Sequence, residues 1–132
     1  MSSDPIVVGT DGSASAELAV DRAAELAKAL GVPLHVVMVL ESAGDPKRAA
    51  ALAEKALADS SERLAARGVT VQTHLRAGSA PAVLMKIAET EGAQMIVVGN
   101  RGMSGPRRIL GSVPNDLAHN ARCGVLIVPT QR

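Results

Sequence analysis

The chain has 132 residues, of which 47% are hydrophobic and 20% are charged, and its formal net charge is +1. This length and composition are typical of one globular domain, residues 1–132, and exclude a disordered chain. A net charge near zero gives no reason to expect binding to nucleic acid or to a membrane surface. The sequence shows no membrane-spanning run, no signal peptide and no cysteine pair, so we expect a cytoplasmic protein.

Short segments rich in β-branched residues alternate with longer segments of helical periodicity. In chain order the patterns predict a strand at 5–10, a helix at 13–30, a strand at 33–40, a helix at 46–67, a strand at 69–75, a helix at 81–91, a strand at 94–99, a helix at 112–121 and a strand at 124–129. The core must be aliphatic, because the chain contains no Phe, Tyr or Trp. The leucines expected to face it from the first two helices are Leu26, Leu30, Leu52, Leu57 and Leu64.

Strand–helix alternation of this kind predicts an α/β fold with an open, doubly wound parallel sheet of five strands and helices on both faces. Five strands are too few to close an eight-stranded β/α barrel. In open parallel sheets, ligands bind at the carboxyl ends of the strands, where the strand order reverses. We therefore look for function in the loops that follow the strands.

One such loop lies in the segment VVGNRGMSGPRRILGSVPND, residues 97–116, between an expected strand and an expected helix. Glycines allow close approach of the backbone to a ligand, and a helix N-terminus favours an anion. The segment from Gly92 to Asn115 holds no carboxylate, and Ser112 adds a hydroxyl at the helix start. The pattern predicts a phosphate site, although it is neither a Walker loop nor a dinucleotide fingerprint. The alternative is a solvated loop whose glycines only form turns.

A second loop follows the first expected strand, in VVGTDGSAS at residues 7–15. Asp11 is a turn or capping residue, or it faces the same crevice and contacts a ribose hydroxyl, a base or a divalent ion. The two roles are compatible.

These two segments, together with residues 78–99 and CGVLIVPT at 123–130, resemble the universal stress protein family, specifically its nucleotide-binding branch, over the whole chain. The family motif is Gly, two residues, Gly, nine residues, then Gly-Ser or Gly-Thr. Gly99, Gly102 and Gly111-Ser112 match it, but only eight residues separate Gly102 from Gly111. The shorter spacing leaves open how many loop amides reach the phosphates.

The resemblance implies a Rossmann-like fold and a set of nucleotide-binding residues. Thr10, Asp11 and Gly12 would line the pocket at the ribose and phosphates, Val39 would contact adenine through its backbone, and Gly78 would lie near the base or ribose. The residues expected to hold ribose and phosphates, or to surround them in the loop, are Gly99, Arg101, Gly102, Met103, Arg107, Gly111, Ser112 and Val113.

The expected function is that of a stress-response or regulatory protein that binds ATP with slow hydrolysis at most, because Asp11 is the one acidic candidate and has no obvious catalytic partner. The sequence leaves open whether Mg²⁺ accompanies the phosphates. One alternative is a cyclic AMP sensor; another is an interaction module with a vestigial pocket. Family members commonly form homodimers, which we expect here through the last strand, Val125 to Val128. The three histidines have no metal-ligand spacing and are expected to be packed or solvated side chains.

Overall fold

The computed structural model describes residues 3–40, 44–100 and 112–130. All the expected strands and helices are present, with ends within two residues of the predicted ones. In chain order they are β1 (Ile6–Thr10), α1 (Ala14–Leu30), β2 (Leu34–Leu40), α2 (Pro46–Ala65), β3 (Val71–Ala77), α3 (Ala80–Glu91), β4 (Met95–Gly99), α4 (Ser112–Asn120) and β5 (Gly124–Val128).

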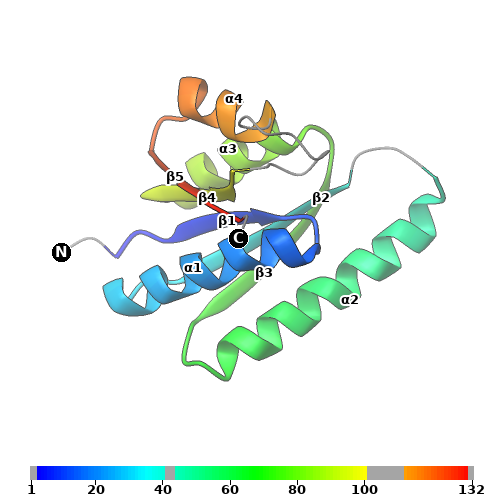
Figure 1. The fold of residues 1–132 in the computed structure, drawn as a ribbon, viewed down its shortest axis with the longest axis horizontal. Helices are drawn as coiled ribbons and strands as arrows, with labels where there is room; N and C mark the ends of the chain where they lie inside the picture. The colour runs from blue at the N-terminus through cyan, green and yellow to red at the C-terminus, as the bar shows by residue number, and fades with distance from the viewer. Residues whose placement is uncertain (1–2, 41–43, 101–111, 131–132) are drawn as a thin grey trace.

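The five strands form one sheet in the order β3-β2-β1-β4-β5, and every neighbouring pair is parallel. Helices α1 and α2 cover one face of the sheet, and α3 and α4 cover the other (Figure 1). The predicted doubly wound α/β fold is therefore confirmed.

Each face of the sheet has its own aliphatic core. On the central strand β1, Ile6 and Val8 pack into the cluster under α1 and α2, while Val7 packs into the cluster under α3 and α4. All five residues of β1 are buried, as expected for a strand covered on both faces. Burying a Val, Leu or Ile side chain contributes about 1.5–3 kcal/mol, so these two clusters supply most of the driving force for folding.

Two leucines expected in the core lie outside it. Leu52 is 61% exposed. The buried face of α2 is narrow and is formed by Ala53 and Leu57, so Leu52, which precedes Ala53, points to the side of that face. Leu30 is 44% exposed because α1 ends there; Gly31 takes the left-handed conformation, and Val32 enters the core instead.

The two edges of the sheet differ in chemistry. On β3, the side chains of Gln72, Thr73 and Arg76 are exposed. On β5, the apolar residues from Val125 to Ile127 are only half-buried. The unpaired edge of β5 is therefore apolar, and that of β3 is polar.

Candidate functional site

The strand order reverses between β1 and β4, which are neighbours in the sheet although α1, β2, α2, β3 and α3 separate them in the chain. This reversal is where open α/β sheets bind ligands. A narrow pocket of about 10 Å³ lies there, lined by Gly9, Ser15, Ala16, Val98, Gly99, Val113 and Thr130. The described residues thus form the inner side of a pocket at the carboxyl ends of β1 and β4, where the sequence predicts a ligand site.

Thr10 ends β1 and is 1% exposed. Its hydroxyl accepts a hydrogen bond from the Gly12 amide (3.0 Å) and donates one to Glu17 Oε2 (2.9 Å). Because the hydroxyl is satisfied inside the protein, the side chain of Thr10 fixes the shape of the loop. A ligand at this position would meet the Thr10 backbone.

Glu17 was not singled out from the sequence, yet it anchors this loop to α2. It accepts hydrogen bonds from Ser60 Oγ at 2.9 Å and from Arg63 Nη2 at 3.1 Å, besides the one from Thr10. Partial burial lowers the pKa of the Arg63 guanidinium, but the hydrogen bond to Glu17 and the charges of Asp21 and Glu17 outweigh that effect and raise it. Glu17 therefore stays fully engaged in holding β1, α1 and α2 together.

Asp11 takes the turn role that the sequence offered as one of two readings. Its Oδ1 accepts a hydrogen bond from the Ser13 amide at 2.9 Å, and Ser13 Oγ in turn caps α1 by accepting from the Ala16 amide at 3.1 Å. Gly12 between them has a φ of +84°, which favours glycine. The Asp11 side chain is exposed, and its Oδ2 has no hydrogen bond to a residue that the structure describes. That oxygen is available to a ligand.

Gly99 ends β4 against the last residues of the described chain. A Cβ at Gly99 would lie 2.8 Å from Cγ2 of Thr130, so any larger residue here would force Thr130 or the end of β4 to shift. Thr130 is held in place because Asn100 Oδ1 accepts hydrogen bonds from its amide and its hydroxyl, each at 3.1 Å. Neither Asn100 nor Thr130 was selected from the sequence, because their pairing depends on the strand register.

Val39 is the last residue but one of β2, where it is in register with Arg76, and Gly78 directly follows β3. Gly78 donates its amide to the Leu40 carbonyl at 3.1 Å and has a φ of +131°. Val39 is 9% exposed and packs on the α3 and α4 side of the sheet. A shallow hollow of about 360 Å³ adjoins Gly78 and is lined by Arg76, Ala77, Gly78, Ser79, Ala82, Val83, Lys86 and Ile87.

Most of the predicted phosphate loop lies outside the residues that the structure describes. Arg101, Gly102, Met103, Arg107 and Gly111 lie outside the described residues. Beyond them, α4 begins at Ser112, as the sequence predicts, and Val113 is 5% exposed and lines the narrow pocket. The structure thus brings Thr10, Asp11, Gly99 and Val113 together at the carboxyl ends of β1 and β4.

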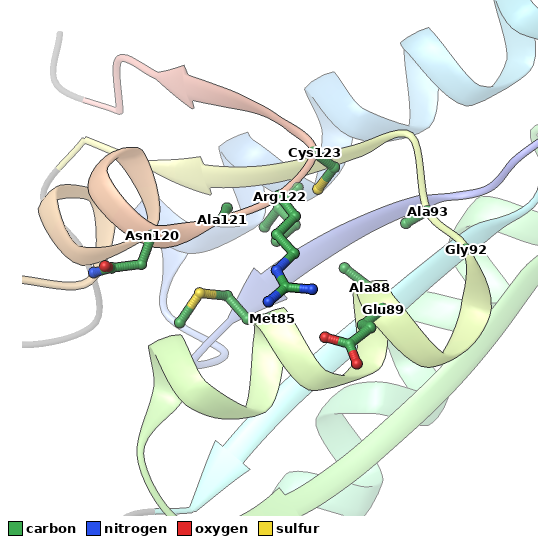
Figure 2. Close-up of a pocket in the computed structure, with 10 residues that line it drawn as sticks. Met85, Ala88, Glu89, Gly92, Ala93, Asn120, Ala121, Arg122 and Cys123 are labelled. Atoms are coloured by element: carbon green, nitrogen blue, oxygen red, sulfur yellow. The ribbon is translucent and has the colours of Figure 1, made fainter.

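A separate hollow of about 350 Å³ lies at the other end of the strands, beside the amino ends of β4 and β5 (Figure 2). Its lining is mostly apolar and comes from α3, the start of β4 and the α4–β5 connection: Met85, Ala88, Glu89, Gly92, Ala93, Ile96, Asn120, Ala121, Arg122 and Cys123. Figure 2 shows Arg122 extending from that connection toward α3. Burial raises the pKa of the Cys123 thiol, which favours its protonated form at neutral pH.

Within residues 3–40, 44–100 and 112–130, no group of three or more His, Cys, Asp or Glu side chains is arranged to hold a metal ion. In the same part of the chain, no helix has the length and apolar character needed to cross a membrane.

The fold is an open, doubly wound parallel α/β sheet, and comparison with known proteins gives the family. The universal stress protein family model matches residues 3–129, and the chain belongs to that family. The universal stress protein Rv1636 of Mycobacterium tuberculosis is 35% identical over 139 residues, covering 95% of both chains.

Two similar solved structures carry nucleotides. A universal stress protein in complex with cAMP is 33% identical, with a TM-score of 0.82 over 99% of this chain and 100% of that one. The universal stress protein from Archaeoglobus fulgidus in complex with dAMP is 28% identical, with a TM-score of 0.76 over 96% of this chain and 98% of that one.

Proposed function

We propose that this chain binds an adenine nucleotide at the carboxyl ends of β1 and β4 and acts as a cytoplasmic regulatory protein of the stress response. The observation that carries the proposal is the place of the glycine motif: Gly99 closes β4 at the switch point, and Ser112 begins α4 beside it. The two nucleotide-bound relatives support the same ligand class.

Among adenine nucleotides, we propose cyclic AMP as the preferred ligand and ATP, with or without Mg²⁺, as the second candidate. The ligands named for the two solved relatives, cAMP and dAMP, each carry one phosphate. The loop between Gly102 and Gly111 is one residue shorter than the family motif, which reduces the number of amides that a triphosphate could use. The presence of the glycine motif itself favours ATP.

We propose slow hydrolysis at most. A base that activates water must be free to accept a proton. Glu17 is engaged by three donors, and Asp11 already uses one carboxylate oxygen in its turn. A steady-state ATPase assay with robust turnover that Asp11→Asn abolishes would contradict this assignment.

The ligand test uses the missing aromatic residues. Because the chain has no Phe, Tyr or Trp, it is almost transparent where adenine absorbs, so the ultraviolet spectrum of the purified protein reports bound nucleotide directly. We expect calorimetry on protein freed of nucleotide to give tighter binding for cyclic AMP than for ATP. The reverse order would establish the second candidate. If AMP, cyclic AMP and ATP all fail to bind, the remaining alternative is an interaction module with a vestigial pocket.

Asp11 and Asp45 offer a matched pair of variants. Each is exposed, and each accepts a hydrogen bond from the amide two residues on, at 2.9 and 3.0 Å respectively, at the start of a helix. We expect Asp45→Ala, which removes the N-cap of α2, to cost about 0.5–2 kcal/mol of stability, and Asp11→Ala, which removes one turn hydrogen bond while Ser13 still caps α1, to cost about 0.5–1.5 kcal/mol. We expect only Asp11→Ala to weaken nucleotide binding, roughly tenfold for one lost charged hydrogen bond. Equal affinities in both variants would remove Asp11 from the site.

We also propose that the chain forms a homodimer through β5, whose apolar residues from Val125 to Ile127 are half-buried at an unpaired edge. An edge of this kind favours a partner strand. The interaction does not compete with nucleotide binding, because β5 pairs with β4 on its other side.

A further inference from the structure

Two histidines lie in direct contact inside the protein, away from the narrow pocket at the switch point. His35 of β2 and His74 of β3 are 4% and 7% exposed, and His35 Nδ1 lies 2.7 Å from His74 Nε2. Their rings stack with centroids 5.0 Å apart and an angle of 24° between the ring planes. Both come from the side of the sheet that α3 covers, since Glu91 of α3 approaches His35.

The neighbours of this pair determine where its protons lie. Arg76 Nη2 is 3.4 Å from His74 Nδ1, and because a guanidinium can only donate, Nδ1 must accept. The proton of neutral His74 is therefore on Nε2, from which it is donated to His35 Nδ1. The proton of neutral His35 is then on Nε2, which lies 3.9 Å from Glu91 Oε1. The four side chains form one directed chain from Arg76 to Glu91.

An additional proton on this chain breaks a contact wherever it binds. On His74 Nδ1 it would face the Arg76 guanidinium, and on His35 Nδ1 it would face the Nε2–H of His74. Burial, the charge of His35 and the charge of Arg76 lower the pKa of His74, while Glu91 opposes them. The charged or titratable groups that act on His74 are therefore His35 on β2, Arg76 on β3 and Glu91 on α3. On the same face of the sheet, β1 contributes the apolar Val7.

The pair adds one contact to a strand that is already paired with β2 along its whole length and packed against the aliphatic cluster under α1 and α2 through Val71 and Leu75. β3 is the edge strand, and β2 is its one neighbour in the sheet. On the side of α3, the residues flanking His74 on β3, Gln72 and Arg76, are exposed, so His74 is the buried contact of β3 on that face. Loss of this contact would leave β3 held by its hydrogen bonds to β2 and by α2.

We propose that the His35–His74 pair is a pH-sensitive switch that tightens the contact of β3 with β2 near neutral pH and loosens it under mildly acidic conditions. β3 leads directly into Gly78, whose amide is bonded to the end of β2. Given the nucleotide site proposed above, on which this consequence rests, loosening of β3 would shift Gly78, which is expected near the base or ribose, and lower the affinity for nucleotide.

The composition of the chain makes the direct test simple. With no Phe, Tyr or Trp, the aromatic C–H signals in the NMR spectrum come only from the imidazoles of His35, His74 and His119. We expect His74 to titrate below pH 6.5, the ordinary value for histidine, and nitrogen shifts to show the Nε2–H tautomer for both members of the pair at pH 7.5. Titration of His74 at or above pH 6.5, or an Nδ1–H tautomer, would overturn the proposal. The variant His119→Gln assigns the exposed signal.

Movement of the strand is read from its amides. We expect the exchange protection of residues 71–77, corrected for the intrinsic pH dependence of exchange, to fall about tenfold between pH 7.5 and pH 5 in wild type, the effect of one lost buried hydrogen bond. His74→Gln places an amide N–H where Nε2–H stood and takes up no proton, so its protection should stay level. Equal losses in wild type and His74→Gln would refute the switch.

Nucleotide affinity is measured over the same pH range as a separate arm. We expect cyclic AMP or ATP to bind more weakly at pH 5 than at pH 7.5 in wild type and equally at both in His74→Gln. Absence of binding at every pH would refute the proposed function, while the titration and exchange results would still decide the switch. A pH-independent affinity with a mobile β3 would overturn the link between the pair and the site.

Discussion

At the scale of single residues, two different reasons can explain why position 99 is a glycine, and experiment can separate them. The glycine motif assigns Gly99 to close approach of a phosphate, whereas the structure shows that a Cβ there would lie 2.8 Å from Thr130 Cγ2. The second requirement holds without any ligand. A substitution at Gly99 therefore reports on packing before it reports on binding.

We expect Gly99→Ala to destabilise the protein by about 1–3 kcal/mol, because the added methyl group overpacks the end of β4. Thr130→Ser removes Cγ2 and keeps the hydroxyl that donates a hydrogen bond to Asn100 Oδ1. Urea unfolding of both single variants and the double variant checks this expectation. The cost of Gly99→Ala should be smaller in the Thr130→Ser background, and additive costs would show that the contact with Thr130 is not the cause.

At the scale of secondary-structure elements, the two edge strands provide a comparison for the proposed homodimer. Leu126 of β5 and Leu75 of β3 are both partly buried leucines packed against the same aliphatic cluster. We expect Leu126→Lys to lower the fraction of dimer and Leu75→Lys to leave it unchanged, because a charge on the pairing strand opposes edge-to-edge association. Analytical ultracentrifugation measures both. An equal effect of the two substitutions would place the interface elsewhere.

The elements themselves follow from the sequence because their signals are local. Continuous apolar runs predict buried parallel strands, and Gly31 and Gly92 mark the ends of α1 and α3, where they take φ values of +68° and +67°. The position of Asp11 after β1 is likewise a local signal. The contact of His35 with His74 joins residues 39 apart and depends on the register of β2 and β3, which the sequence does not specify.

At the scale of the whole molecule, the buried pair predicts how stability depends on pH. The pKa of His74 is lowered in the folded protein, chiefly by burial, so below pH 6.5 the unfolded chain binds this proton more readily than the folded one. Its contribution to stability is therefore complete above pH 6.5 and is lost as the pH falls through the folded pKa.

We expect the free energy of unfolding to fall more steeply between pH 7 and pH 5 in wild type than in His74→Gln. Circular dichroism during urea denaturation is the suitable probe, because the chain has no Trp or Tyr fluorescence. The difference between the two proteins isolates His74 from the carboxylates that titrate at lower pH. Parallel pH profiles would show that His74 does not set the dependence.

The unequal edges of the sheet also limit how far copies of this chain can grow into larger assemblies. When two copies join through β5, each uses its apolar edge, and the outer strands of the combined sheet are then the two copies of β3. These ends present Gln72, Thr73 and Arg76 to solvent beside the half-buried Val71 and Leu75, so they are more polar than the edge of β5. In the proposed homodimer, association through the sheet would therefore close at two copies, and the polar outer edges would oppose growth into open-ended fibres.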